Sequence, residues 1–515
     1  MAEILAPTTL EVYREILYHP VRRELTLTRA ALTKPVLVVL AACVVGCGGA
    51  PPRQETPLPS EAELRAQLDA LEHTPLVDTA LPALPDAPGV LIRGATVLTA
   101  AGDRHSPGWI RLKGGRIDDL GSGEGPEPLN GERVIEAEGR FVTPGLVDTH
   151  SHMGVYAQPR IWAHADGNEM TNPVTAGVWS EHGFWPQDPT LQRAVAGGVT
   201  TAQILPGSGN LMGGRAVTLK LHPRRNARAM RFPGAPAGLK MACGENPKRV
   251  YGKYRKAMPM SRMGSIYMMR DRWVKASAYA RKWAKWREDP YTKNKKGQKT
   301  GIKPPPDRDL VLETLSEVLA GRVLVHVHCY RADEMLTQLQ LAREFGYSIR
   351  SFHHAVEAYK ISDVLAKANV SVSTWADWWG FKIEAYDAVE QNLALVHAAG
   401  GRAILHTDSP EGIQRMNQEA AKGLYAGRRA GLKITEDEAL QWLTLHPAWA
   451  LGIHEQTGTL EKGKMADVVI WDGHPFSVYT RAQYVFIDGH QRHGPGATET
   501  WSDFEVGHPA AVETP

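Results

Sequence analysis

The chain has 515 residues, of which 43% are hydrophobic and 22% are charged, and its formal net charge is +3 at pH 7. This composition is typical of a soluble globular protein, and the length fits a large barrel with an accessory module. The small net charge argues against nucleic acid as a partner, because phosphate binding needs a strongly basic surface. The charge is nevertheless uneven, since Lys and Arg crowd the segment 248–308 and leave the rest of the chain acidic.

The N-terminal segment predicts export. A basic flank precedes an apolar run from Val36 to Cys47, which is too short to span a bilayer and is typical of a secretory signal. Cys43 and Cys47 each end a stretch that resembles the bacterial lipobox, in which the cysteine is lipidated. We therefore expect residues 1–48 to be an export segment of a lipoprotein on the periplasmic side of the bacterial envelope, with the true start near Val21. A buried apolar helix is the alternative.

The next segments predict a linker and a small β-domain. Residues 49–88 combine a Pro-rich linker with a short helix over 61–71. Short alternating strands with glycine turns follow over 89–142, and a matching β-rich piece returns at 455–492. One composite β-sandwich, assembled from both flanks, explains the two pieces, and residues 493–515 form a C-terminal tail.

Residues 143–454 predict a (β/α)₈ barrel of the TIM type, so the fold class is α/β with a small composite β-sandwich. Apolar β-rich runs alternate with helical patterns over this segment, as such a barrel requires. Strands two to four leave little room for helices between them. A basic insertion at 250–309 includes a helical pattern over 270–287, which would serve as a lid, a membrane contact or a solvated face. The expected strand ends are His152, Ile204, Leu221, Cys243, His328, His354, Thr374 and Asp408.

Four cysteines occur in the chain, and two of them lie in the export segment. The other two, Cys243 and Cys329, lie at the ends of predicted strands. We expect both to be small buried thiols, because this pattern offers no disulfide framework.

Polar side chains end several barrel strands. His150 and His152, in RFVTPGLVDTHSHMG, lie on one face of a strand because side chains alternate, and they lie at its C-terminal end, where barrels carry active sites. Imidazole and carboxylate groups are ligands that suit Zn²⁺. The sequence therefore predicts a divalent metal site, with Zn²⁺ as the expected ion. The other polar strand ends are His326 with His328, His353 with His354, and His406 with Asp408.

Residues from about 90 to 490 resemble the amidohydrolase superfamily, in its imidazolonepropionase-like branch, which also contains metal-dependent Xaa-Pro dipeptidases. The motifs that carry the resemblance are TPGLVDTHSH, AGGVTTAQILPGSGN, HTDSP and LEKGKMADVVIWD. The resemblance implies that a carboxylate from strand four bridges two metal ions, and the candidates are a carboxylated Lys240 and Glu245. A mononuclear site that uses neither remains open. The metal ligands that it implies are His150, His152, His328, His354 and Asp408.

A hydrolytic mechanism follows from these residues. A divalent ion acidifies its bound water, and Asp408 would accept the proton and pass it to the leaving nitrogen; a plain ligand role is the alternative. Tyr330 would meet a substrate carboxylate or an oxyanion. Glu357, in a His-x-x-Glu-Ala pattern that resembles the family's, would orient His354 through a hydrogen bond. His326 is expected to be a packed, hydrogen-bonded histidine.

The sequence thus predicts a metal-dependent amidohydrolase that cleaves an amide-type C–N bond, linear or cyclic. The alternatives are an Xaa-Pro dipeptidase and a non-catalytic metal- or ligand-binding lipoprotein. The expected partner is a small-molecule or dipeptide-like substrate, with membrane contact through a lipid anchor and with self-association into a homo-oligomer left open.

Overall fold

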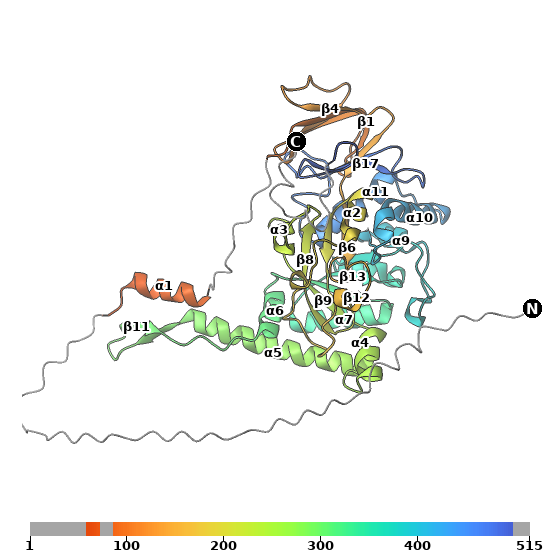
Figure 1. Cartoon of the computed structure of the whole chain (residues 1–515). Coiled ribbons are helices and arrows are strands. Elements are labelled where there is room, and N and C mark those ends of the chain that lie inside the picture. The colour runs from red at the N-terminus through yellow and green to blue at the C-terminus, as the bar shows by residue number, and fades with distance from the viewer. Residues whose placement is uncertain (1–57, 73–85, 498–515) are drawn as a thin grey trace, which may run out of the picture. The chain divides into compact units, whose positions relative to one another are not determined.

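The structure is a computed structural model that describes residues 58–72 and 86–497 (Figure 1). The predicted export segment, with Cys43 and Cys47, lies outside the described residues. Helix α1 (Glu61–Glu72) confirms the short helix predicted there. It begins with a capping box, in which the Glu63 amide donates to Ser60 Oγ at 3.2 Å and the Ser60 amide donates to Glu63 Oε2 at 2.7 Å.

Both flanks of the barrel contribute strands to one eight-stranded sheet, in the order β18-β17-β16-β5-β1-β2-β3, with β4 paired to β1. The two flanks meet where β5 pairs antiparallel with β16. Buried side chains such as Ile92, Val97 and Ile470 fill its core. The predicted assembly of this domain from both flanks is therefore confirmed, and the strands of the expected sandwich form one continuous sheet. The strands are β1 (Val90–Leu98), β2 (Arg104–Lys113), β3 (Arg116–Ser122), β4 (Arg133–Glu136), β5 (Phe141–Pro144), β16 (Val468–Trp471), β17 (Ala482–Ile487) and β18 (His490–His493).

The second eight-stranded sheet forms the barrel, in the order β15-β14-β13-β12-β9-β8-β7-β6. Its two ends meet where the Asp408 amide donates to the His150 carbonyl at 3.1 Å. The predicted barrel fold is confirmed. The strands are β6 (Leu146–Ser151), β7 (Val199–Ile204), β8 (Met212–Lys220), β9 (Gly238–Ala242), β12 (Leu324–Cys329), β13 (Ile349–His354), β14 (Ser371–Thr374) and β15 (Ala403–Leu405).

One barrel strand runs against the others. Strand β8 pairs antiparallel with both β7 and β9. The connection from β7 to β8 spans only residues 205–211, and a parallel pair needs a crossover of about a dozen residues or more. The short spacing between strands two and four therefore reverses this strand.

Helices pack against the barrel strands and turn their apolar faces toward the sheet. Helix α10, for example, buries Met416, Ala420 and Leu424, which recur every four residues on one face. Shorter pieces are α3 (Ala227–Met230), α4 (Glu245–Lys248), η1 (Trp162–His164), η2 (Ser180–His182), η4 (Ala358–Ile361), η5 (Ile383–Ala385) and η6 (Gly412–Arg415). The longer helices are α2 (Pro189–Ala196), α6 (Leu310–Leu319), α7 (Ala332–Phe345), α8 (Ser362–Lys367), α9 (Asn392–Ala398), α10 (Met416–Arg429), α11 (Glu436–Gln441) and α12 (Leu445–Ala450).

The basic insertion contains the longest helix of the described residues, α5 (Arg262–Glu288), which confirms the predicted helical pattern. It follows a π-helical turn, η3 (Arg249–Tyr254), and precedes a hairpin of β10 (Tyr291–Lys293) and β11 (Lys299–Ile302). Figure 1 shows α5 beside α6, with the hairpin at its end. Among the described residues, no helix is both long and apolar enough to cross a bilayer.

Cys243 and Cys329 form a disulfide, with 5.2 Å between their Cα atoms. The prediction of two buried thiols was therefore wrong. The cysteines are 86 residues apart in the sequence, and they become neighbours only because β9 and β12 pair side by side in the barrel. The bond ties together the ends of the two strands that carry Lys240 and His328.

Candidate active site

Four predicted ligands from three strand ends converge at the C-terminal rim of the barrel. Nε2 of His150 lies 3.3 Å from Nε2 of His152. Oδ1 of Asp408 lies 3.3 Å from Nε2 of His152 and 3.6 Å from Nε2 of His150. The other carboxylate oxygen, Oδ2, lies 3.9 Å from Nε2 of His354. We call these four residues the rim cluster.

The backbone turns sharply at two members of the rim cluster. His354 and Asp408 have φ angles of 69° and 52°, in the left-handed region that few residues other than glycine adopt. Such strained conformations occur preferentially at functional sites. Here they lie at the points where β13 ends and where the chain leaves β15.

Burial determines the charge of the rim cluster. Desolvation lowers the pKa of His150 and of His354 well below the usual value, so both rings are neutral at pH 7 and can bind a metal ion. Burial would raise the pKa of Asp408, but the hydrogen bond and the charge of His152 outweigh it, and the pKa is lowered. The cluster thus combines the neutral imidazoles of His150 and His354 with the carboxylate of Asp408.

Lys240 enters the same space from β9. Its side chain is buried, and Nζ donates to the Pro206 carbonyl at 3.1 Å and lies 3.4 Å from Nε2 of His150. Burial lowers the pKa of Lys240 to about 7, so a large fraction of the amine is unprotonated at neutral pH.

Glu245 and His328 do not join the rim cluster. Glu245 is the first residue of α4, and its carboxylate lies 3.7 Å from Nζ of Lys382. The ring of His328 lies 4.6 Å from that of His354, but its Nε2 accepts a hydrogen bond from Asn246 Nδ2 at 3.3 Å. The structure therefore brings Lys240, and not Glu245, to the four converging side chains.

His406, which the sequence analysis did not assign as a ligand, also lies here. The groups of ligand atoms that lie within 4.8 Å of one another in the described residues are His150 with His152 and Asp408, and His150 with His354 and His406. Its position at a strand end, two residues before Asp408, is a signal that could have identified it.

Several ring nitrogens at the rim have unmet bonding capacity. Nδ1 of His328, of His354 and of His406 is buried and has no hydrogen-bond partner within the described residues. A buried polar atom without a partner costs about 1–3 kcal/mol, so such atoms are rare and collect at functional sites. Together with the imidazole and carboxylate donors, they make the rim a site that fits a divalent cation.

Two predicted catalytic residues lie differently from the expectation. Glu357 does not orient His354: it accepts from the Ala332 amide at 2.9 Å and pairs with Lys360 at 3.4 Å, while Nδ1 of His354 has no partner in the described chain. The carboxylate of Glu357 instead caps α7, because the start of a helix leaves amides unbonded.

Tyr330 is buried, and its ring stacks on that of His354 with 5.2 Å between the ring centroids. Burial raises the pKa of Tyr330, so its hydroxyl stays protonated.

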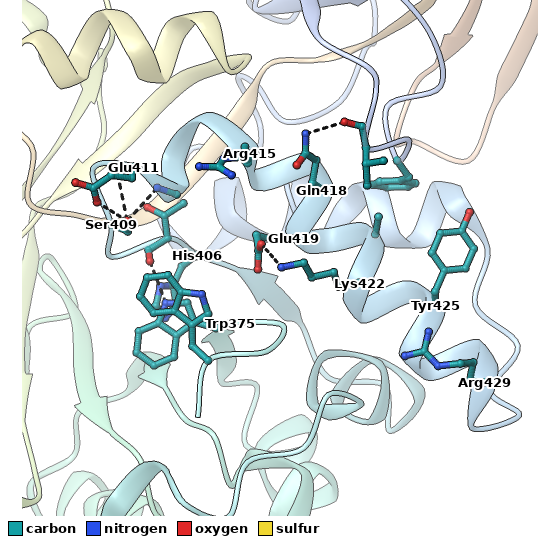
Figure 2. Close-up of a pocket in the computed structure, with 16 residues that line it drawn as sticks. Trp375, His406, Ser409, Glu411, Arg415, Gln418, Glu419, Lys422, Tyr425 and Arg429 are labelled. Atoms are coloured by element: carbon teal, nitrogen blue, oxygen red, sulfur yellow. Dashed lines mark hydrogen bonds and ion pairs between the residues drawn. The ribbon is translucent and has the colours of Figure 1, made fainter. Parts of the chain in front are cut away.

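Two members of the rim cluster line one cavity, and the chain neighbours of Asp408 line a second. One, of about 450 Å³, is lined by His152, Asp408, Tyr156 and Arg160 among others. Figure 2 shows the second, of about 510 Å³, where the ion pair of Glu419 and Lys422 faces Trp375. Ser409 lines both cavities. Their volumes suit small-molecule ligands.

Comparisons with known proteins agree with this geometry. The model of the amidohydrolase family matches residues 141–494. The amidohydrolase tasK of Hapsidospora irregularis is 33% identical over 69% of this chain, which spans only 37% of that protein's length. The imidazolonepropionase of Brucella anthropi is 26% identical, over 76% of this chain and 94% of its own.

A solved structure agrees as well. The crystal structure of an amidohydrolase from Thermotoga maritima MSB8 superposes with a TM-score of 0.71 at 34% identity, over 79% of this chain and all of that one. This relative shares both the barrel and a third of the aligned residues. The chain belongs to the amidohydrolase family, in its imidazolonepropionase-like branch.

Proposed function

We propose that this protein is a metal-dependent hydrolase that cleaves an amide-type C–N bond, linear or cyclic, in a small molecule. The convergence of His150, His152, His354 and Asp408 at 3.3–3.9 Å carries the proposal. These residues would hold a divalent cation, and imidazole with carboxylate is a donor set that suits Zn²⁺.

Lys240 is the better candidate for a bridging carboxylate. Its amine lies beside His150 in the rim cluster, whereas Glu245 pairs with Lys382. A neutral amine can add CO₂ and release a proton, which gives a carbamate anion. The carbamate of Lys240 would supply a second negative group, and His328, His354 or His406 would complete a second ion's ligands.

Asp408 would move the proton in the reaction. A bound divalent cation would acidify a water molecule and polarise the substrate carbonyl. Asp408 faces the same space with two carboxylate oxygens and has a lowered pKa, so it would take the proton of the attacking water and return it to the leaving nitrogen. The protonated hydroxyl of Tyr330, next to His354, would donate a hydrogen bond to a developing oxyanion.

The export and lipid anchor predicted for residues 1–48 remain part of the proposal. The disulfide of Cys243 and Cys329 supports it, because disulfides persist in oxidising compartments such as the bacterial periplasm. Labelling of the expressed protein with a radioactive fatty acid tests it, with Cys43→Ala and Cys47→Ala as separate variants. Loss of the label in one of them identifies the lipidated cysteine, and no label in the wild type contradicts the anchor.

Metal content combined with a substrate screen tests the enzymatic proposal. The purified chain, loaded with Zn²⁺ or Mn²⁺, should hydrolyse members of a panel of cyclic and linear amides. A response confined to Xaa-Pro dipeptides would favour the dipeptidase alternative. Bound metal without turnover of any amide would favour the non-catalytic alternative.

The number of metal ions bound per chain tests the bridge. Lys240 is identified as the bridge if the wild type and Glu245→Gln each bind two ions and Lys240→Met binds one.

A further inference from the structure

A line of four buried side chains crosses the barrel interior behind the rim cluster. Nδ1 of His150 lies 2.9 Å from Nδ1 of His353, and Nε2 of His353 lies 2.9 Å from Nδ1 of His326. Nε2 of His326 then lies 3.4 Å from the side-chain amide of Gln203. The residues come from β6, β13, β12 and β7, and each is at most 1% exposed. We call this line the histidine relay.

The relay permits only two arrangements of its protons. A neutral imidazole has one N–H donor and one acceptor nitrogen, so each ring that accepts on one side must donate on the other. In the first arrangement His150 donates from Nδ1, His353 and His326 donate from Nε2, and the amide of Gln203 accepts. In the second, the amide donates, every proton moves to the other nitrogen of its ring, and His150 carries its proton on Nε2.

Only the first arrangement leaves His150 able to bind a cation. Nε2 of His150 is the atom that faces His152 and Asp408, and a proton on it would occupy the lone pair that a cation needs. The choice between the arrangements therefore depends on the far end of the relay, where the amide of Gln203 presents either its oxygen or its nitrogen.

The amide of Gln203 can present either its nitrogen or its oxygen to His326. With the nitrogen in that position, Oε1 is buried and has no hydrogen-bond partner in the described part of the chain. The two ends of an amide have nearly the same shape, so a half-turn exchanges them without a change in packing. The turned amide would place an acceptor against Nε2–H of His326.

We propose that Gln203, His326 and His353 are positioning residues that hold His150 in the tautomer with a free Nε2, so that the rim cluster is ready for a divalent cation. The inference rests on the proposed metal-dependent function. It assigns a role to Gln203 on β7, which acts on His150 through the rings of His326 and His353.

The test compares substitutions at the far end of the relay in the full-length chain. Gln203→Leu removes the acceptor. Gln203→Glu keeps an acceptor and, as a carboxylate, has no donor. Thr201→Val is the matched control. Thr201 lies on the same face of β7, is equally buried, and has a hydroxyl without a hydrogen-bond partner in the described chain. The readout is the Zn²⁺ dissociation constant from competition with a chelator, alongside thermal unfolding of the metal-free protein.

Gln203→Leu is expected to weaken Zn²⁺ binding by about tenfold, as loss of an outer hydrogen-bond partner typically does. Gln203→Glu and Thr201→Val should bind as the wild type does. If Gln203→Leu binds Zn²⁺ as tightly as the wild type does, the relay is wrong, but the proposed function is unaffected. The same conclusion follows if the leucine and glutamate variants weaken Zn²⁺ binding equally. Failure of the wild type to bind any divalent cation would overturn both.

A second measurement does not depend on the leucine variant folding. In the metal-free wild type with ¹⁵N-labelled imidazole rings, the signals of His150, assigned by their loss in His150→Asn, should show the Nδ1–H tautomer. The Nε2–H tautomer would overturn the proposal.

Discussion

The two halves of the barrel rim are built differently. On the side of β6 and β15, hydrogen bonds close the barrel: the Asp408 amide donates to His150, and Thr407 Oγ1 donates to Asp148 at 2.6 Å. On the side of β9 and β12, a disulfide joins Cys243 to Cys329. The first half presents an imidazole pair and a carboxylate. The second half presents the amine of Lys240 and His328, whose Nε2 already accepts a bond from Asn246.

The difference indicates a division of roles. The β6–β15 half has the donors that a cation needs without any chemical change. The β9–β12 half lacks an anionic group directed at the cluster, because Glu245 is paired with Lys382, and it would need carboxylation of Lys240 to supply one. One ion would therefore depend on the first half, and a second ion on the second half.

The strongest test of the first half is Asp408→Asn. The amide keeps the shape of the carboxylate but cannot accept the water's proton, so kcat should fall by about 10³-fold. Bound metal, measured by elemental analysis, should remain because the three histidines persist. Turnover within a few-fold of the wild type would contradict the proton-transfer role.

The double variant Cys243→Ala/Cys329→Ala removes the disulfide that joins β9 to β12 in the second half of the rim. We expect the free energy of unfolding to fall by about 2–4 kcal/mol, because the bond restricts a long loop in the unfolded chain. Urea unfolding of the metal-free protein measures the loss. The control is the same comparison under reducing conditions, where the two proteins should have equal stability; a persistent difference would mean that packing, and not the bond, is responsible.

The lowered pKa of Lys240 predicts a pH dependence of stability. The folded protein releases this proton at about pH 7, whereas the unfolded chain keeps it until about pH 10. Between these values the unfolded state binds more protons, so the free energy of unfolding should rise with pH. Relative to Lys240→Met, the metal-free wild type should gain about 2 kcal/mol from pH 7 to pH 9 in buffer free of CO₂. Parallel curves for the two proteins would show that the amine is not perturbed.

The smallest effect is expected for Glu357→Gln. Because this carboxylate caps α7 and pairs with Lys360, the substitution should cost about 0.5 kcal/mol of stability and leave kcat/KM within about twofold of the wild type. A large loss of activity with unchanged stability would restore the predicted role next to His354. Chemical denaturation and steady-state kinetics on the same preparation provide both values.

Local patterns in the sequence were sufficient for the fold and for the core of the candidate site. Side chains alternate along a strand, so His150 and His152 had to share a face, and the C-terminal ends of parallel barrel strands meet at one rim, so Asp408 and His354 were expected beside them. The same reasoning identified the strand that carries Lys240, although it could not choose between that residue and Glu245.

Contacts between residues far apart in the chain were decided by the tertiary structure. The antiparallel direction of β8, the bond between Cys243 and Cys329, the pairing of Glu245 with Lys382 and the capping role of Glu357 all depend on which elements become neighbours. The periodicity of a strand or helix determines which face of that element is buried, but not which side chain it meets across the barrel. For this reason the sequence predicted candidate ligands, and only the folded chain showed which of them lie together.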